Sequence, residues 1–130
     1  MKIATHVARC FLGLVFFVFG LNGFLNFIPM PPPEGPSGDF LGAMVKTGYL
    51  LQLVKTTEVT CGALLLANRF VPLALVMLAP VLVNITFFHA FLTPPKDMVG
   101  PVIFLTVYGF LIWRYRASFA PLFTAKVTPS

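Results

Sequence analysis

The sequence predicts an all-α protein: a transmembrane four-helix bundle with a short interfacial helix in the first outer loop. Four apolar stretches cover approximately residues 9–28, 49–67, 70–92 and 98–115. Each is close to the ~20 residues that an α-helix needs to cross a hydrocarbon core of ~30 Å. Hydrophobic residues make up 58% of the chain and charged residues 10%, against roughly 45–50% and ~25% in soluble domains. With 130 residues, the chain is expected to form one membrane domain.

The first stretch is interpreted as an uncleaved helix, since no small-residue cleavage site follows it. With four spans, both termini lie on the same side of the membrane. That side carries six cations and no acid, whereas the opposite loops carry three acids and two lysines. The positive-inside rule therefore predicts cytoplasmic termini, and we expect a multi-pass protein of the bacterial cytoplasmic (inner) membrane. The six cations are Lys2, Arg9, Arg69, Arg114, Arg116 and Lys126; the opposite residues are Glu34, Asp39, Lys46, Lys96 and Asp97.

The first outer loop contains the interfacial helix. The proline-rich residues 29–36 predict a stiff, extended segment, because proline fixes φ and lacks a backbone donor. Asp39 is then expected to cap a short helix with its apolar residues on one side, and Gly48 to end it. This helix is expected to lie flat in the outer interface. At the far end of the last stretch, Trp113 and Tyr115 are typical of an interfacial aromatic belt.

Lys55 and Glu58 lie inside the second apolar stretch, about 9 and 13 Å from its outer end. Ionisable groups at such depth are costly and normally face the interior of a bundle. At i and i+3 the two side chains can pair, and the lysine can also extend toward the interface. Two interpretations remain open. The pair either neutralises itself and stabilises the bundle, or Glu58 is a proton-exchanging group of a functional site.

The other polar residues inside the spans also fall in the outer half. Asn22 and Asn26 share one face of the first helix, and Asn84 and His89 follow Pro80 in the third. Asn84 and His89 are about 140° apart around their helix, so we expect that they do not address one point unless the helix kinks. Because the inner half is almost purely hydrocarbon, this one-sided polarity predicts a cavity that opens outward, or toward the lipid near the outer leaflet. A pore would need polar residues on both sides of the midplane.

Several classes of function are disfavoured. The cations form no patch of the kind that binds nucleic acid. His6 and His89 lie at opposite ends of the bundle, so neither a metal nor a haem site is expected. Cys10 and Cys61 lie at different depths and form no CxxC motif, and both are interpreted as structural thiols.

The chain resembles the DoxX family of membrane proteins over residues 9–121. The resemblance rests on four segments: FLGLVFFVFGLN at 11–22, TEVTCGALLL at 57–66, RFVPLA at 69–74 and PVLVNI through His89 at 80–89. Within them it depends most on Gly20, Glu58, Gly62, Asn84 and His89. The resemblance implies a four-helix membrane protein in which Glu58 matches the typical glutamate of the second helix. Gly23 departs from the pattern, because many members carry a lysine there.

One branch of this family is tied to a membrane thiosulfate–quinone oxidoreductase, and other members accompany redox or biosynthetic operons. The resemblance therefore implies a subunit or accessory of a membrane redox complex with a quinone or hydrophobic ligand and no covalently bound cofactor. The sequence has no electron carrier of its own, so a redox role requires a partner protein, and whether the chain is itself an enzyme stays open. The alternative is a non-enzymatic membrane protein that binds lipid or another hydrophobic ligand, or stabilises a complex. The expected partners are the lipid bilayer and another protein subunit, either a redox partner or a second copy of the chain. The candidate ligand-binding residues are Glu58, Lys55, Asn84, His89, Asn22 and Asn26.

Overall fold

The computed structural model describes residues 2–29 and 33–130, and all regular elements in those ranges are helices. Among the described residues, four helical segments are long and apolar enough to cross a membrane. They are α1 (Lys2–Leu25), α3 (Leu50–Ala67), α4 (Val71–Leu92), and η1 (Pro95–Met98) together with α5 (Val99–Arg114). The shorter α2 (Gly35–Lys46) precedes α3, and α6 (Arg116–Phe119) and η2 (Ala120–Phe123) follow α5. The predicted fold class is confirmed.

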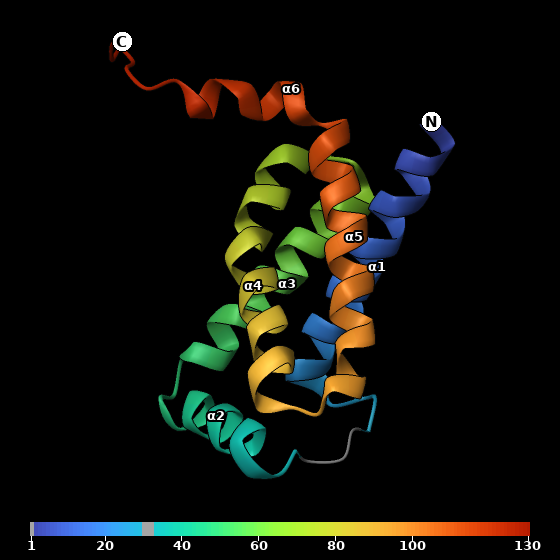
Figure 1. Ribbon diagram of the computed structural model, residues 1–130, viewed down its shortest axis with the longest axis vertical. Coiled ribbons are helices and arrows are strands. Elements are labelled where there is room, and N and C mark those ends of the chain that lie inside the picture. The colour runs from blue at the N-terminus through green and yellow to red at the C-terminus, as the bar shows by residue number, and fades with distance from the viewer. Residues whose placement is uncertain (1, 30–32) are drawn as a thin grey trace.

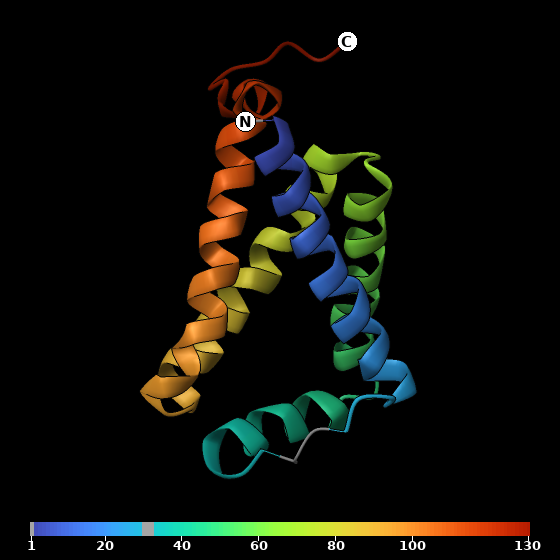
Figure 2. The ribbon, with the colours of Figure 1, turned by 90° about the vertical axis from the view of Figure 1, so that its right-hand side faces the viewer.

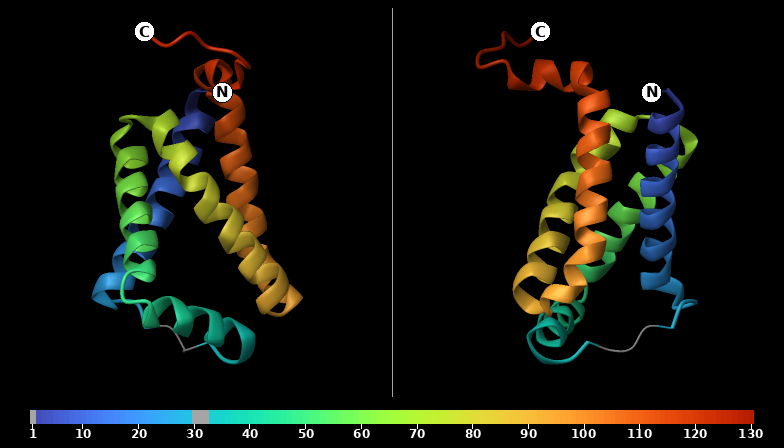
Figure 3. Two further views of the ribbon diagram at one scale, coloured as in Figure 1. Left: turned by 90° about the vertical axis from the view of Figure 1, so that its left-hand side faces the viewer. Right: turned by 45° about the vertical axis from the view of Figure 1, so that its right-hand side comes forward.

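The bundle consists of two helix pairs that diverge. Both termini lie at the same end (Figure 1), and at that end all four spans come together. From there the pair of α1 and α3 separates from the pair of α4 and α5, as Figure 2 shows. Helix α2 lies across the wide end, and the views in Figure 3 show it below both pairs. We call the two parts of the bundle the packed half, which contains the termini, and the open half, which adjoins α2.

Helices α1 and α3 form the closest contact, and glycines make it possible. A Cβ added to Gly62 would lie 2.5 Å from the backbone nitrogen of Phe17, and one added to Gly20 would lie 2.9 Å from that of Val59. Small residues let transmembrane backbones approach, and van der Waals packing then holds the helices together. The face of α1 that carries Gly20 therefore packs against α3.

Arg9 connects the same two helices in the packed half. Its side chain is 7% exposed; the guanidinium donates to the carbonyl of Leu65 and, at 3.3 Å, to that of Leu66. These carbonyls belong to the last turn of α3, where acceptors lack the i+4 donor of a continuing helix and a positive charge is favourable. Arg9 therefore caps the end of the neighbouring helix α3, and it is also one of the cations at the end of the bundle that holds the termini.

Helices α4 and α5 are also joined in the packed half. The Tyr108 hydroxyl donates to the Leu75 carbonyl at 2.6 Å, in the part of α4 that precedes Pro80. The helix continues through that proline. The buried apolar residues cluster around this junction: Leu12, Phe16, Cys61, Leu65, Val71, Ala74, Leu75, Leu78, Leu82, Leu111 and Phe119.

The sequence predicted the ends of α3 and α4 well. The expected stretches 49–67 and 70–92 became Leu50–Ala67 and Val71–Leu92. Asn68, with φ +56°, ends α3. The Arg69 backbone donates to the Leu64 carbonyl at 3.0 Å, which is typical of helix ends of this type.

One helix is longer than its apolar stretch, and one expected helix start was wrong. Helix α1 begins at Lys2, ahead of the stretch at 9–28, because nothing in residues 2–8 interrupts a helix. Helix α2 begins at Gly35, so Asp39 lies inside it and does not cap it. The physical reason is Pro36, which is favourable in a first helical turn, where its missing N–H is not needed. Residues 30–32 of the expected extended segment lie outside the described residues.

Thr47 makes the turn between α2 and α3. Its hydroxyl donates to the Met44 carbonyl at 2.6 Å and accepts from the Leu50 backbone nitrogen at 3.0 Å. Gly48, with φ +81°, completes the turn in the left-handed conformation that glycine adopts most easily. The expected end of this helix near Gly48 is confirmed.

Helix α6 and η2 were not expected from the sequence. They turn away from α5 and run across the end of the bundle (Figure 1). Phe119 is buried against the core, and Arg114 and Arg116 lie 5.7 and 4.9 Å from the centre of the Trp113 ring. The aromatic and basic residues at the end of α5 therefore form one cluster.

Candidate functional site

A cavity of about 400 Å³ lies in the open half, between the diverging helix pairs. Each of the helices α1 to α5 contributes residues to its wall. Most of the wall is apolar, and the polar part comes from α3 and α4. The lining residues are Val15, Phe16, Phe19, Phe40, Leu41, Met44, Leu51, Val54, Lys55, Glu58, Asn84, Ile85, Phe88, His89 and Phe104.

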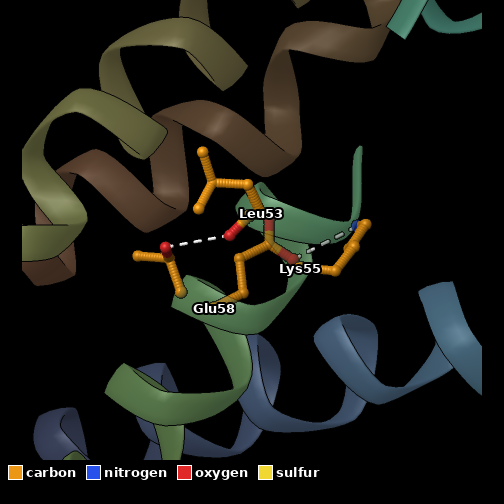
Figure 4. Close-up of polar contacts among 4 residues, drawn as sticks. Leu53, Lys55 and Glu58 are labelled. Atoms are coloured by element: carbon orange, nitrogen blue, oxygen red, sulfur yellow. Dashed lines mark hydrogen bonds and ion pairs between the residues drawn. The ribbon is translucent and has the colours of Figure 1, made fainter. Parts of the chain in front are cut away.

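Lys55 and Glu58 form an ion pair on the α3 wall of the cavity. The Lys55 Nζ lies 3.2 Å from the Glu58 Oε2, and the two side chains are 24% and 5% exposed, respectively. Figure 4 shows the two side chains reaching toward each other along one side of α3. The sequence-based expectation that they can pair is confirmed. Because the carboxylate is the more buried partner, it depends more on the pair than the lysine does.

Gly23 provides the space for the lysine. A Cβ added at Gly23 would lie 2.6 Å from the Lys55 Cγ and 2.7 Å from its Cδ. The aliphatic part of Lys55 therefore crosses α1 at this glycine, and its ammonium group returns to Glu58. The position at which the sequence departs from the DoxX pattern thus contacts the ion pair of the site.

Asn84 lies on the α4 wall of the cavity. Within the described part of the chain its side-chain amide has no hydrogen-bond partner, and it is exposed. An unpaired amide in an apolar environment is unfavourable by roughly 2–7 kcal/mol, depending on the reference state. The Asn84 amide is therefore available to a molecule in the cavity.

His89 lies one further turn along the same wall. Its Nδ1–H donates to the Ile85 carbonyl of its own helix at 2.8 Å, so in the neutral ring Nε2 is left as an acceptor. The sequence predicted that Asn84 and His89 do not meet at one point unless the helix kinks; the structure places both on the border of one wide cavity. Ile85 and Phe88 lie between them around α4, and all four residues border the cavity. A wide cavity can therefore be bordered by residues that lie too far apart around a helix to contact the same neighbouring side chain.

Asn22 and Asn26 are absent from the described lining of the cavity. The Asn22 Oδ1 accepts from the Ile28 backbone nitrogen at 2.7 Å, and its carbonyl accepts from the Asn26 backbone nitrogen at 2.9 Å. Asn26 itself has φ +51°, which asparagine tolerates better than most residues. The structure thus places these two candidates at the end of α1, where they terminate the helix.

The sequence did not assign any cavity residue to α2. Phe40, Leu41 and Met44 of α2 line the cavity, and the Phe40 and Phe88 rings are 5.7 Å apart. These are the residues whose spacing predicted an apolar helix face. The signal was therefore present, but the sequence could not show that this face would cover the end of the bundle.

Comparison with known proteins gives a family for the chain. A family model described as DoxX matches residues 4–90. The match includes α1 to α3 and almost all of α4, and with them the four polar residues of the cavity, whereas α5 lies outside it. No curated protein and no solved structure shows significant similarity to the chain. Since the matched segment contains 87 of the 130 residues, the chain belongs to the DoxX family.

Proposed function

We propose that this DoxX family protein is an accessory subunit of a membrane redox complex and binds a quinone, or a similar amphipathic molecule, in the cavity of the open half. One observation carries the proposal. A cavity with phenylalanine- and leucine-rich walls has an ion pair, an unpaired amide and an imidazole on its border. Small-molecule sites typically combine apolar walls with a few such polar groups in a volume of ~300–1,000 Å³.

The polar groups suit both redox forms of a quinone head. The carbonyl oxygens of a quinone need donors, which Lys55 Nζ and the Asn84 amide supply. The hydroxyls of a quinol need acceptors, which the Glu58 carboxylate and His89 Nε2 supply. Reduction of quinone to quinol takes up two electrons and two protons. In the proposal a partner protein delivers the electrons, and Glu58 and His89 are the groups that exchange protons with the head.

The alternative is a non-enzymatic protein that binds lipid or another hydrophobic ligand, or stabilises a complex. The completeness of the Lys55–Glu58 pair favours it. The carboxylate already has a partner at 3.2 Å and is almost fully buried, so the pair needs no ligand to be neutral. In that case the cavity holds an apolar molecule and the polar wall contributes only structure.

Titration of the purified protein with a short-chain quinone analogue tests the proposal. Saturable binding is expected for the wild type, and its loss is expected in the double variant Glu58→Leu/Lys55→Met, which removes both charges and keeps similar volumes. His89→Ala should weaken binding by one hydrogen bond, about 0.5–1.5 kcal/mol. Gln52→Leu is the matched control, because it removes a polar residue of α3 that is not among the described lining residues.

Two results would contradict the proposal. One is the absence of saturable binding by the wild type, and the other is undiminished binding by the double variant. Equal affinity for the quinone analogue and for a hydrocarbon of the same size would instead support the non-enzymatic alternative.

The orientation is part of the same proposal. The end of the bundle that holds both termini also holds Arg9, Arg69, Arg114 and Arg116, so we place it in the cytoplasm. A cytoplasmic reporter fused after Ser130 should be active, and a periplasmic reporter at that position should be inactive. The reverse result would place the cavity in the cytoplasmic half of the membrane.

A further inference from the structure

A second concave surface lies outside the cavity, between α1 and α5 in the packed half. This groove has a volume of about 650 Å³ and is lined by Ala4, Val7 and Phe11 of α1, and by Ile103 and Phe110 of α5, among others. The two helices lie side by side toward the end with the termini, as Figure 2 shows. From Ala4 to Phe11 the groove follows α1 for ~10 Å, which is most of one leaflet of a ~30 Å hydrocarbon core.

The surface of the groove is apolar along its length. Among the described lining residues the one polar side chain is Thr106, and its hydroxyl donates to the Val102 carbonyl of its own helix at 2.8 Å. The described lining therefore offers an occupant no free hydrogen-bond donor. An alkyl chain fits such a surface, and a polar solute does not.

Basic side chains gather at the end of this groove nearest the termini. The Arg114 Nε donates to the Thr5 Oγ1 at 2.9 Å. This bond holds the guanidinium between α5 and α1, next to the groove residue Ala4. Among the described residues, Arg114 has no acidic partner, and the ion pair found there is Lys55–Glu58. Arg116 lies on the neighbouring Trp113 ring, and Lys2 precedes Thr5 by one turn.

No acidic side chain is available to neutralise these cations. The four acids of the chain are Glu34, Asp39, Glu58 and Asp97, and they belong to α2 and its flank, to the ion pair of the cavity, and to η1. All of them are remote in the fold from the end with the termini. A groove for an alkyl chain thus ends in a cluster of cations that lacks an internal counterion.

We propose that the groove between α1 and α5 is a binding site for an anionic phospholipid. The acyl chain lies along the groove, and the phosphate lies at Arg114, with Arg116 and Lys2 adding to the positive potential. Arginine is well suited to this role because its planar guanidinium binds phosphate oxygens in pairs. The site is separate from the cavity of the proposed function and does not depend on it.

A second copy of the chain fits the groove less well than a lipid. In a parallel dimer across this face, each copy would bring its own Arg114 and Arg116 to the end where the other already carries them, and like charges would repel. Anionic lipid supplies the missing negative charge instead, and cations close to an anionic surface each add to the attraction.

Trp113 provides a direct reporter, because it is the single tryptophan of the chain. Its ring lies 6.2 Å from that of Phe110, which lines the groove. The full chain is reconstituted in phosphatidylcholine bilayers that contain an equal, low mole fraction of brominated phosphatidylglycerol or brominated phosphatidylcholine. Brominated phosphatidylglycerol should quench Trp113 more strongly, because it is enriched at the site.

Two variants and two matched controls make the test specific. Arg114→Gln should reduce the relative affinity for phosphatidylglycerol by about fivefold, the contribution of one cation near an anionic surface. Ala4→Phe should reduce it by filling the groove while leaving all charges in place. Arg69→Gln removes a cation from the α3–α4 turn at the same end, and Ala67→Phe adds the same bulk there; both should keep the preference.

Each remaining outcome would overturn the proposal. Equal quenching by the two brominated lipids would show that the groove does not select an anion. An equal loss in Arg69→Gln and Arg114→Gln would show attraction to the whole surface rather than a site. If Arg114→Gln does not fold, undiminished preference in Ala4→Phe is sufficient to reject the groove. A disulfide-linked dimer of an Ile103→Cys variant, with no lipid-dependent quenching, would assign the groove to a second copy.

Discussion

The packed half and the open half use the same four helices in opposite ways. In the packed half, leucines and glycines fill the space between helices, and polar groups such as Arg9 and Tyr108 are bonded to backbone carbonyls of neighbouring helices. In the open half the helices separate, and Asn84 has no bonding partner within the described chain. The contrast indicates that one half maintains the structure while the other keeps a cavity available.

This division has a physical basis. A cavity inside a bundle forgoes the dispersion contacts that its walls would otherwise make, so its maintenance requires strong contacts elsewhere. The α1–α3 contact supplies them, because its backbones approach too closely for any side chain to enter at Gly62. Variants at the close contacts of the packed half should therefore lose folding, and variants at open-half residues without a partner, such as Asn84, should lose binding.

The largest effect is expected from Gly62→Leu in the packed half. A Cβ there would lie 2.5 Å from the Phe17 nitrogen and 2.8 Å from the Gly13 carbonyl oxygen. These are backbone atoms, so α1 and α3 would have to separate. The cost should exceed the ~1–3 kcal/mol of ordinary overpacking, and the variant should not yield a folded bundle in detergent by circular dichroism and size exclusion.

Gly109→Leu is the matched control for this substitution. Gly109 lies in α5, and a Cβ there would meet nothing within 4 Å. This variant should fold like the wild type. If the two variants behaved alike, close approach of α1 and α3 would not be what stabilises the packed half.

The next effect is expected at the border of the two halves, in the Lys55–Glu58 pair. Removing one partner from a buried pair costs about 3–5 kcal/mol in soluble proteins. Lys55→Met should cost more than Glu58→Gln, because Glu58 is 5% exposed and Lys55, at 24%, can extend toward water. The double variant Glu58→Leu/Lys55→Met should recover much of either loss. Thermal unfolding of the four proteins in detergent measures this cycle, and additive losses would show that the two residues are not coupled.

The smallest effect on stability is expected from Asn84→Leu in the open half. The amide has no partner to lose, so stability should change by less than about 1 kcal/mol. Binding of the quinone analogue should weaken by one hydrogen bond, about 0.5–1.5 kcal/mol. Asn22→Leu should show the reverse pattern, because Asn22 bonds the Ile28 nitrogen and is not among the described cavity residues. Both asparagines lie in the open half, so similar behaviour of the two variants would show that bordering the cavity does not decide whether an asparagine there serves binding or folding.

Much of the fold could be predicted from the sequence because hydrophobic length and loop charge are local properties. Asn68 marks the end of α3 by residue type, and the short turn after it requires α3 and α4 to be antiparallel neighbours. The start of α2 was missed because Pro36 interrupts a helix in its middle but is favourable in its first turn. Helix α6 was missed because Phe119 is stabilised by the core, which no local pattern shows.

The sequence predicted how deep the candidate site residues lie along their helices, but not which way their side chains face in the bundle. Counting residues along a helix shows how far Lys55, Glu58, Asn84 and His89 lie from the membrane surface, and all four do border one cavity. Counting does not show how helices tilt relative to one another, and the divergence of α4 from α3 is what allows residues about 140° apart on α4 to share a wall. Asn22 lies at the expected level but is used by the end of its own helix.

The position of α2 has a consequence for how affinities of the cavity are to be measured. Its Phe40, Leu41 and Met44 place an apolar layer between the cavity and the adjacent aqueous phase. A water-insoluble ligand is then in exchange chiefly with the bilayer, so occupancy follows the mole fraction of the ligand in lipid. Diluting the membrane with extra phospholipid at constant total ligand should therefore empty the cavity, while diluting the whole suspension with buffer should leave its occupancy almost unchanged.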